Sequence, residues 1–166
     1  MGKSVSVLLV AAVCVVLFGL PAAANAEDMN IAKRWAVGLS ASPFSGYAPT
    51  VEYWTSDNFG LSANFSWYYW WSTITVRGTY LFDDRINIFS MPARPYAGAG
   101  VGFTSWYGGH SAPGLEVFGG LLQPFSQQFS VRAELNAASY GLFYKDPGHG
   151  WFPIGVGFGV FYHFGG

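Results

Sequence analysis

IGVGFGVFYHF, residues 154–164, places Ile, Val, Phe, Val, Tyr and Phe at every second position, with Gly, Gly, Gly, Phe and His between them. Successive side chains of a β-strand point to opposite faces, so a period of two is the strand signature. The stretch therefore predicts a strand with one continuous apolar face and one face made mostly of small residues.

The same period of two recurs along the chain before this stretch. Together with 154–164 it predicts eight strands, at residues 35–41, 50–54, 60–67, 74–82, 96–104, 115–122, 129–136 and 154–164. Turn-forming residues separate most of them. The long connection 83–93 contains residues 86–91, for which the pattern permits either a short helix or an added strand turn.

The polar faces of these strands carry charged residues in mid-strand, namely Glu52, Arg77, Glu116, Arg132 and Glu134. In a soluble barrel the polar faces would meet water, and the interior would have to hold nearly all the strand Trp, Phe and Tyr. Eight strands enclose too little volume for that. A membrane barrel inverts the two faces. We therefore expect an all-β protein, a closed eight-stranded antiparallel transmembrane β-barrel.

Composition agrees with a chain that meets lipid. Only 10% of the residues are charged and 19% are aromatic, whereas soluble domains carry about 25% charged residues. The net charge of −1 excludes a basic nucleic-acid binder. After Leu20 no stretch of about 18 apolar residues occurs, which excludes a helical membrane span.

The N-terminal residues have the pattern of a secretory signal. A basic start and an apolar run precede Ala24-Asn25-Ala26, which fits a cleavage site. We expect residues 1–26 to be a cleaved signal peptide and residues 27–166 to form the barrel domain. The only cysteine, Cys14, lies in the signal, so we expect no disulfide. The histidines show no ligand spacing, and we expect no metal site and no cofactor.

Aromatic residues gather near the strand ends, as anchoring at the lipid headgroups requires. The expected interface residues are Trp67, Tyr69, Trp71, Trp106 and Trp151 on one side and Tyr162 and Phe164 on the other. An even strand number puts both termini on one side, which we assign to the periplasm together with 56–58, 83–93 and 123–128. The segments 43–47, 70–72, 105–113 and 141–151 are then outer loops.

Two stretches carry a family resemblance. Residues 94–103, RPYAGAGVGF, and residues 156–164, VGFGVFYHF, resemble a glycine-rich strand and the C-terminal signal of small bacterial outer-membrane β-barrel proteins of the OmpA/OmpX type. The resemblance implies the outer membrane of a Gram-negative cell envelope, contact with its lipid and lipopolysaccharide, and insertion by the outer-membrane assembly machinery. The His-x-Ser-Asn run of the lipid A deacylases is absent from residues 131–139.

Three groups of residues are candidates for function. The five charged residues above would form an ion-pair network that plugs the lumen, or alternatively a gate. The glycines Gly98, Gly100, Gly102, Gly155, Gly157 and Gly159 would line the lumen and accommodate neighbouring aromatic rings, or leave a slot for an acyl chain. His110 and Ser111 could form a hydrolytic pair in an outer loop, although Gly108-Gly109 and Pro113 indicate a flexible turn.

These candidates lead to three functional classes. The first is a porin-like but plugged outer-membrane barrel, monomeric, with a structural, adhesive or surface-interaction role and no catalysis. The alternatives are a lipid A-modifying hydrolase or acyltransferase at the outer leaflet, and a narrow gated channel or transporter.

The first prediction concerns the barrel itself. On a gel, membrane-extracted protein that has not been boiled should run as a compact band, and boiling should shift it, because a closed barrel keeps its backbone hydrogen bonds in detergent. Soluble periplasmic protein with no such shift would mean that the two strand faces are inverted.

Overall fold

The structure is a computed structural model that describes residues 31–32, 34–42, 46–68, 71–88, 91–106, 109, 111–140 and 154–165. The expected signal peptide lies outside these residues. Within these ranges, no helix has the length and apolar character needed to span a membrane.

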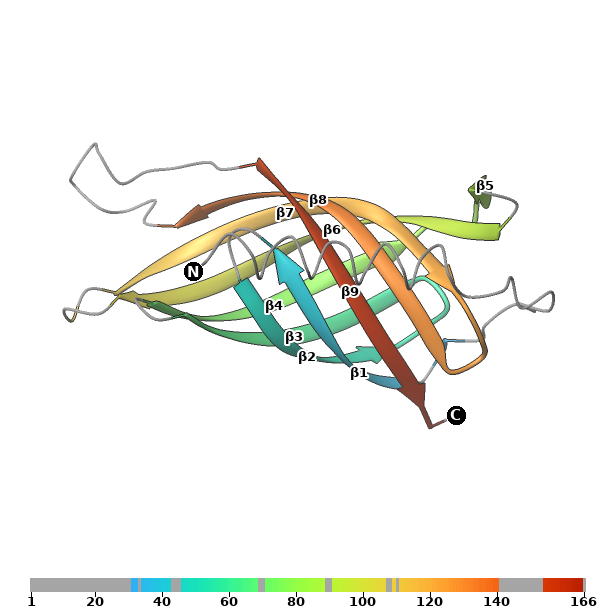
Figure 1. The fold of residues 1–166 in the computed structure, drawn as a ribbon, viewed down its shortest axis with the longest axis horizontal. Coiled ribbons are helices and arrows are strands. Elements are labelled where there is room, and N and C mark those ends of the chain that lie inside the picture. The colour runs from blue at the N-terminus through green and yellow to red at the C-terminus, as the bar shows by residue number, and fades with distance from the viewer. Residues whose placement is uncertain are drawn as a thin grey trace, which may run out of the picture.

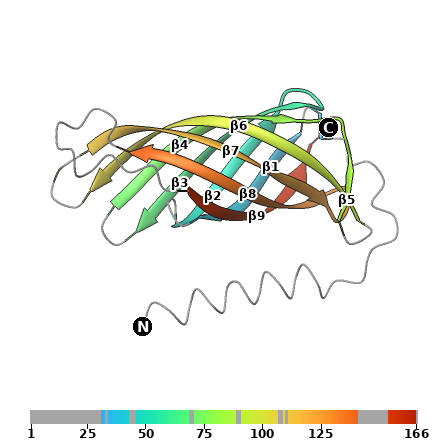
Figure 2. The same cartoon turned by 90° about the horizontal axis from the view of Figure 1, so that it is seen from above.

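The described chain forms one antiparallel sheet that closes on itself (Figures 1 and 2). Its strands are β1 (Trp35–Ser42), β2 (Gly46–Trp54), β3 (Phe59–Tyr68), β4 (Trp71–Leu81), β5 (Ile86–Ile88), β6 (Met91–Trp106), β7 (Ser111–Pro124), β8 (Phe129–Tyr140) and β9 (Ile154–Phe164). In the barrel wall β1 to β4 pair in sequence, as do β6 to β9. The wall closes because β1 pairs with β9 and β4 pairs with β6. The expected closed eight-stranded antiparallel barrel is confirmed.

The short strand β5 is additional to the eight strands of the barrel wall and lies outside it. Its three residues pair only with the start of β6, from Ile86 opposite Ala93 to Ile88 opposite Met91. The hairpin projects at the end of the barrel where β1 begins and β9 ends, here named the terminal end (Figure 1). Of the two structures expected for residues 86–91, the added strand is correct for the described residues 86–88 and Met91.

Several strands extend further than the sequence indicates. Ser111 pairs with Ser105, and Trp71 pairs with both Tyr68 and Trp106, so the expected outer loops 70–72 and 105–113 are shorter than predicted. Likewise β2 begins at Gly46, inside the expected loop 43–47, and β7 ends at Pro124, inside the expected turn 123–128. Pairing with a neighbouring strand continues the ladder through residues whose local preference is for turns.

The two faces of the wall are inverted relative to a soluble protein. Leu39 and Leu135 on the outer face are 66% and 62% exposed, whereas Ser66 and Thr73 on the inner face are 0% and 1% exposed. Apolar residues outside and polar residues inside are the arrangement of a transmembrane barrel. The expected orientation of the faces is thus confirmed.

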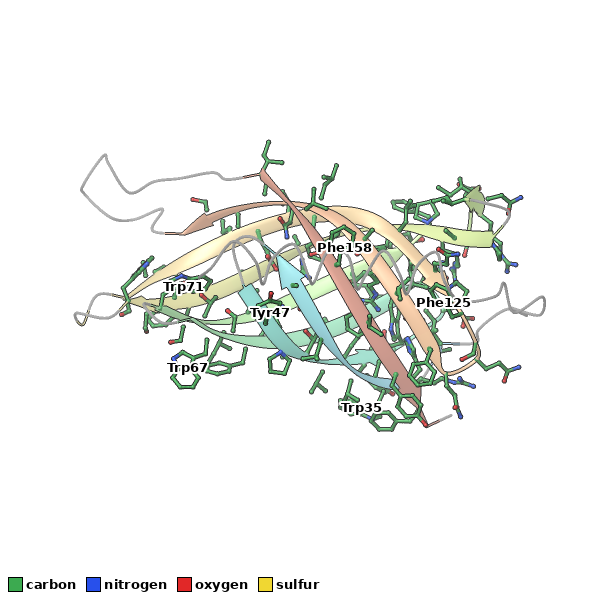
Figure 3. The ribbon with its side chains drawn as sticks, in the orientation of Figure 1. Trp35, Tyr47, Trp67, Trp71, Phe125 and Phe158 are labelled. Carbon is green, nitrogen blue, oxygen red and sulfur yellow. The ribbon has the colours of Figure 1, made fainter. Side chains whose placement is uncertain are left out.

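Aromatic side chains lie at both ends of this apolar surface. Figure 3 shows Trp67 and Trp71 at the end opposite the terminal end, here named the far end, and Trp35 at the terminal end. Tyr162 stacks with Phe164, with ring centroids 6.2 Å apart. Trp106 is half-buried at the far end. Of the other expected interface residues, Tyr69 and Trp151 lie outside the described residues.

The outer face gives the second prediction. Val101 pairs with Val76 in the middle of β4 and is 59% exposed, so Val101→Arg would place a cation near the middle of the hydrocarbon. We expect the free energy of unfolding in lipid vesicles to fall by about 2–4 kcal/mol. Val101→Ala, which adds no charge, is the matched control. Equal effects of the two variants would show that Val101 does not face lipid.

Candidate functional site

All the charged residues of the inner face except Glu52 lie beside glycines on the neighbouring strands. Arg77 pairs with Gly100, and Gly100 pairs with Glu116. Glu134 pairs with Gly157 in the same way. A Cβ on Gly100 would lie 2.9 Å from Glu116 Oε1 and 3.1 Å from Arg77 Cγ. These glycines therefore leave the space in which long charged side chains lie across the wall.

The first ion pair joins opposite parts of the wall. The Arg132 guanidinium on β8 donates through Nη1 to Glu52 Oε1 on β2 at 2.8 Å and through Nη2 to Glu52 Oε2. Trp54 Nε1 also donates to Glu52 Oε2, at 2.9 Å. The Glu52 side chain is fully buried. The charges of this bidentate pair balance, because one guanidinium meets one carboxylate, while Arg132 Nε is buried without a hydrogen-bond partner.

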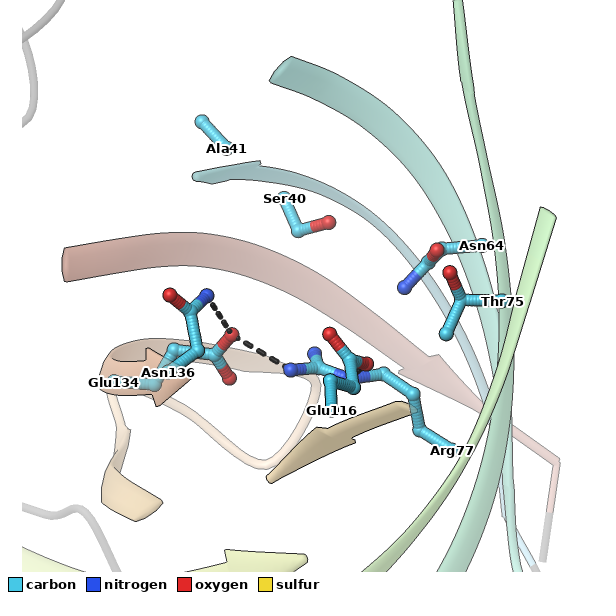
Figure 4. A pocket seen from close by; sticks show the side chains of 8 residues that line it. All are labelled: Ser40, Ala41, Asn64, Thr75, Arg77, Glu116, Glu134 and Asn136. Atoms are coloured by element: carbon cyan, nitrogen blue, oxygen red, sulfur yellow. Dashed lines mark hydrogen bonds and ion pairs between the residues drawn. The ribbon is translucent and has the colours of Figure 1, made fainter. Parts of the chain in front are cut away.

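The second cluster holds one guanidinium between two carboxylates (Figure 4). Arg77 Nη2 donates to Glu134 Oε1 at 2.8 Å. Arg77 Nε lies 2.5 Å from Glu116 Oε1, an ion-pair contact whose angle does not meet hydrogen-bond geometry. Glu134 also accepts from the Tyr96 hydroxyl at 3.1 Å and from Asn136 Nδ2 at 3.4 Å. The five charged residues thus form two separate clusters.

Aromatic rings cover both guanidiniums. The Arg77 guanidinium carbon lies 3.8 Å from the Phe118 ring centroid, and that of Arg132 lies 4.2 Å from the Phe161 ring centroid. The same two rings occupy the space beside Gly98 and Gly159, where an added Cβ would collide with them. The space left by these glycines is filled by aromatic rings, and an acyl slot finds no support there.

An apolar layer lies inside the barrel toward the terminal end. Its buried members are Ile31, Trp54, Leu81, Tyr96, Phe118 and Leu122. Ile31 precedes β1 and is held there by a hydrogen bond from Arg34 N to its carbonyl, at 3.2 Å, while Trp54 N donates to Arg34 O. Sequence reasoning missed Ile31, because a single apolar residue outside any periodic stretch gives no signal.

Sequence reasoning also missed a buried pair of polar side chains, Ser130 and His163. Ser130 Oγ and His163 Nε2 lie 2.8 Å apart inside the barrel, and both side chains are at most 1% exposed. The alternation in β8 and β9 places both residues on the inner face, and the sequence alone gave no reason to pair them. Their burial keeps them away from any external substrate.

The expected hydrolytic pair receives no support from the described residues. Ser111 is exposed and is the first residue of β7, opposite Ser105. His110 lies outside the described residues. Among the described residues no group of three or more His, Cys, Asp or Glu is arranged to hold a metal ion.

The Glu52–Arg132 pair gives the third prediction. Glu52→Gln should lower the free energy of unfolding by about 3–5 kcal/mol, because it leaves the Arg132 charge buried without its partner. The double variant Glu52→Gln with Arg132→Met should be destabilised less than Glu52→Gln alone, as urea unfolding in detergent would measure.

The matched control is an exposed ion pair at the terminal end. Arg94 Nη2 lies 3.5 Å from Asp83 Oδ1, and the Asp83 side chain is 84% exposed. Asp83→Asn should change the free energy of unfolding by less than about 1 kcal/mol. A Glu52→Gln effect as small as that of Asp83→Asn would contradict the buried pair.

Comparison with solved structures finds the same fold in other β-barrels. The N-terminal β-barrel domain of OprF from Pseudomonas aeruginosa is 18% identical in sequence and superposes with a TM-score of 0.64. The alignment covers 80% of this chain and 98% of the OprF domain. A de novo designed transmembrane β-barrel is 15% identical and has a TM-score of 0.51. That alignment covers 80% of this chain and 97% of the designed chain.

Sequence comparison adds no family. No protein-family model matches the chain. No curated protein matches it either. At these identities the structural likeness is one of fold, and at that level the resemblance seen in residues 94–103 and 156–164 is confirmed. The chain has the fold of the small eight-stranded transmembrane β-barrels.

Proposed function

We propose that this chain is an integral protein of the bacterial outer membrane with a plugged lumen and a structural, adhesive or surface-interaction role. The observation that carries the proposal is the pairing of charged side chains from different parts of the wall across the lumen. Glu52 on β2 meets Arg132 on β8, and Arg77 on β4 meets Glu134 on β8.

The contents of the described interior support a plugged lumen. Eight strands enclose just enough space for side chains. The two ion-pair clusters and the apolar layer, which includes Trp54 and Phe118, lie in that space. An ion crossing the lumen would have to separate a buried pair, and breaking such a pair costs several kcal/mol. A closed lumen leaves the outer surface and the ends of the barrel as the parts that act.

The membrane assignment has two supports. The exposed apolar belt requires a hydrocarbon environment, and the N-terminal barrel domain of OprF, from a bacterium, has the same fold. With an even number of barrel strands the start of β1 and the end of β9 lie at the same end, the terminal end, and we assign that end to the periplasm. We also propose that residues 1–26 are cleaved. The outer-membrane assembly machinery would then recognise residues 156–164 and insert the barrel.

Contacts at the far end would then face outward. Trp67 is 79% exposed and Trp106 is half-buried at that end. Indole rings combine an apolar body with a polar N–H and suit the boundary between lipid and headgroup. We propose that they contact lipopolysaccharide, and that the barrel works as a monomer.

A second candidate function is a narrow gated conductance. The observation that favours it is the position of Arg77, which already contacts two carboxylates, Glu116 and Glu134. A guanidinium with two partners can exchange between them, whereas Arg132 has a single bidentate partner. The gate would then lie at Arg77 and the seal at Arg132.

Bilayer conductance gives the fourth prediction and separates the two functions. Folded protein in planar bilayers should show no stepwise openings, and neither should Arg132→Ala, because the Arg77 cluster and the apolar layer still fill the lumen. Val101→Ala, changed only on the outer face, is the matched control for intact insertion. Openings of the unaltered protein would contradict the plugged lumen and favour the gate.

A further inference from the structure

The two ion-pair clusters differ in charge balance. Glu52 and Arg132 cancel each other, whereas Arg77 is shared by Glu116 and Glu134. The side chains of this triad are 11%, 10% and 12% exposed, respectively. One carboxylate charge is therefore left without a counter-charge in a poorly solvated interior, where an uncompensated charge is costly.

A small polar cavity lies beside the triad (Figure 4). Side chains from β1, β3, β4, β7 and β8 line it, namely Ser40, Ala41, Asn64, Thr75, Arg77, Glu116, Glu134 and Asn136. It offers about 10 Å³ for the centres of water-sized molecules, close to the least that holds a single water. Six of the eight lining side chains carry oxygen.

Two amide oxygens among these have no hydrogen-bond partner. Asn64 and Asn136 are 7% and 4% exposed, and the Oδ1 atom of each is buried and unpartnered. For Asn136 the amide orientation follows from its contact, because Nδ2 faces the Glu134 carboxylate at 3.4 Å. A carbonyl oxygen can only accept, so each Oδ1 requires a donor or a cation.

We propose that this cavity, here named the triad cavity, binds one small monovalent cation, with Na⁺ as the best fit. Carboxylate, amide and hydroxyl oxygens are ligands for hard cations. One positive charge neutralises the triad, whereas a divalent ion would leave an excess positive charge next to Arg77. The room for about one water matches a small ion. The site does not depend on whether the lumen conducts.

The fifth prediction is a cation-dependent stability. Folded full-length protein in detergent is unfolded with urea in NaCl or in N-methylglucamine chloride, whose cation is too large for the cavity, at constant ionic strength so that screening is equal. The unfolding equilibrium constant should fall steadily as Na⁺ rises, and it should be about tenfold lower when the Na⁺ concentration is about nine times the dissociation constant.

Two variants test where the cation binds. Glu116→Gln removes the uncompensated charge and should abolish the Na⁺ effect. Asp84→Asn removes an exposed carboxylate outside the barrel and should retain the effect in full. The ²³Na relaxation rate of the same samples should be enhanced by the unaltered protein and by Asp84→Asn, and less so by Glu116→Gln.

The proposal would be overturned by equal unfolding in the two salts for the unaltered protein, or by a Na⁺ effect that persists in Glu116→Gln. A protein that is insensitive to Na⁺ but loses stability as the pH rises would show that a proton neutralises the triad. Because the unaltered protein alone can refute the site, the test stands even where a variant fails to fold.

Discussion

The structure depends on the need to pair every backbone N–H and C=O where no water is present. A sheet in hydrocarbon meets this need only by closing, which here takes the contacts of β1 with β9 and of β4 with β6. Closure also fixes the interior. With eight strands in the wall, the space inside accommodates side chains and little else, so the inner face must be built of residues that fit and pair.

In that interior, glycines on one strand leave room for long charged side chains on the next. Arg77, Glu116 and Glu134 are long, and each has a glycine as a cross-strand neighbour. Gly100 is an example, because a Cβ at this position would clash with the side chains of both Arg77 and Glu116. The inner-face glycines thus make room for ion pairs and for the rings that cover them.

The interior also divides along the barrel axis. The apolar layer and the charge-balanced pair of Glu52 with Arg132 lie toward the terminal end. The triad of Arg77, Glu116 and Glu134 instead faces a polar cavity with unpartnered oxygens. An apolar layer beside an acceptor-rich cavity fits the barrel we propose, which would hold a small ion without passing it. The surface role and the cation site are therefore compatible.

Much of the fold follows from the sequence, because strand alternation is local. The eight strands, the outward apolar face and the inward positions of Glu52, Arg77, Glu116, Arg132 and Glu134 can all be predicted from a period of two. Strand ends cannot, since pairing carries β7 back to Ser111 through residues that favour turns.

The partners of the lumen residues were decided only by tertiary structure. Nothing local in the sequence joins Glu52 to Arg132, 80 residues apart, or leaves Arg77 between two carboxylates, or brings Ile31 into the apolar layer. These contacts depend on the register of all eight strands at once and on closure of the barrel. Side-chain orientation along a strand is a property of that strand, whereas contact across a lumen is a property of the whole wall.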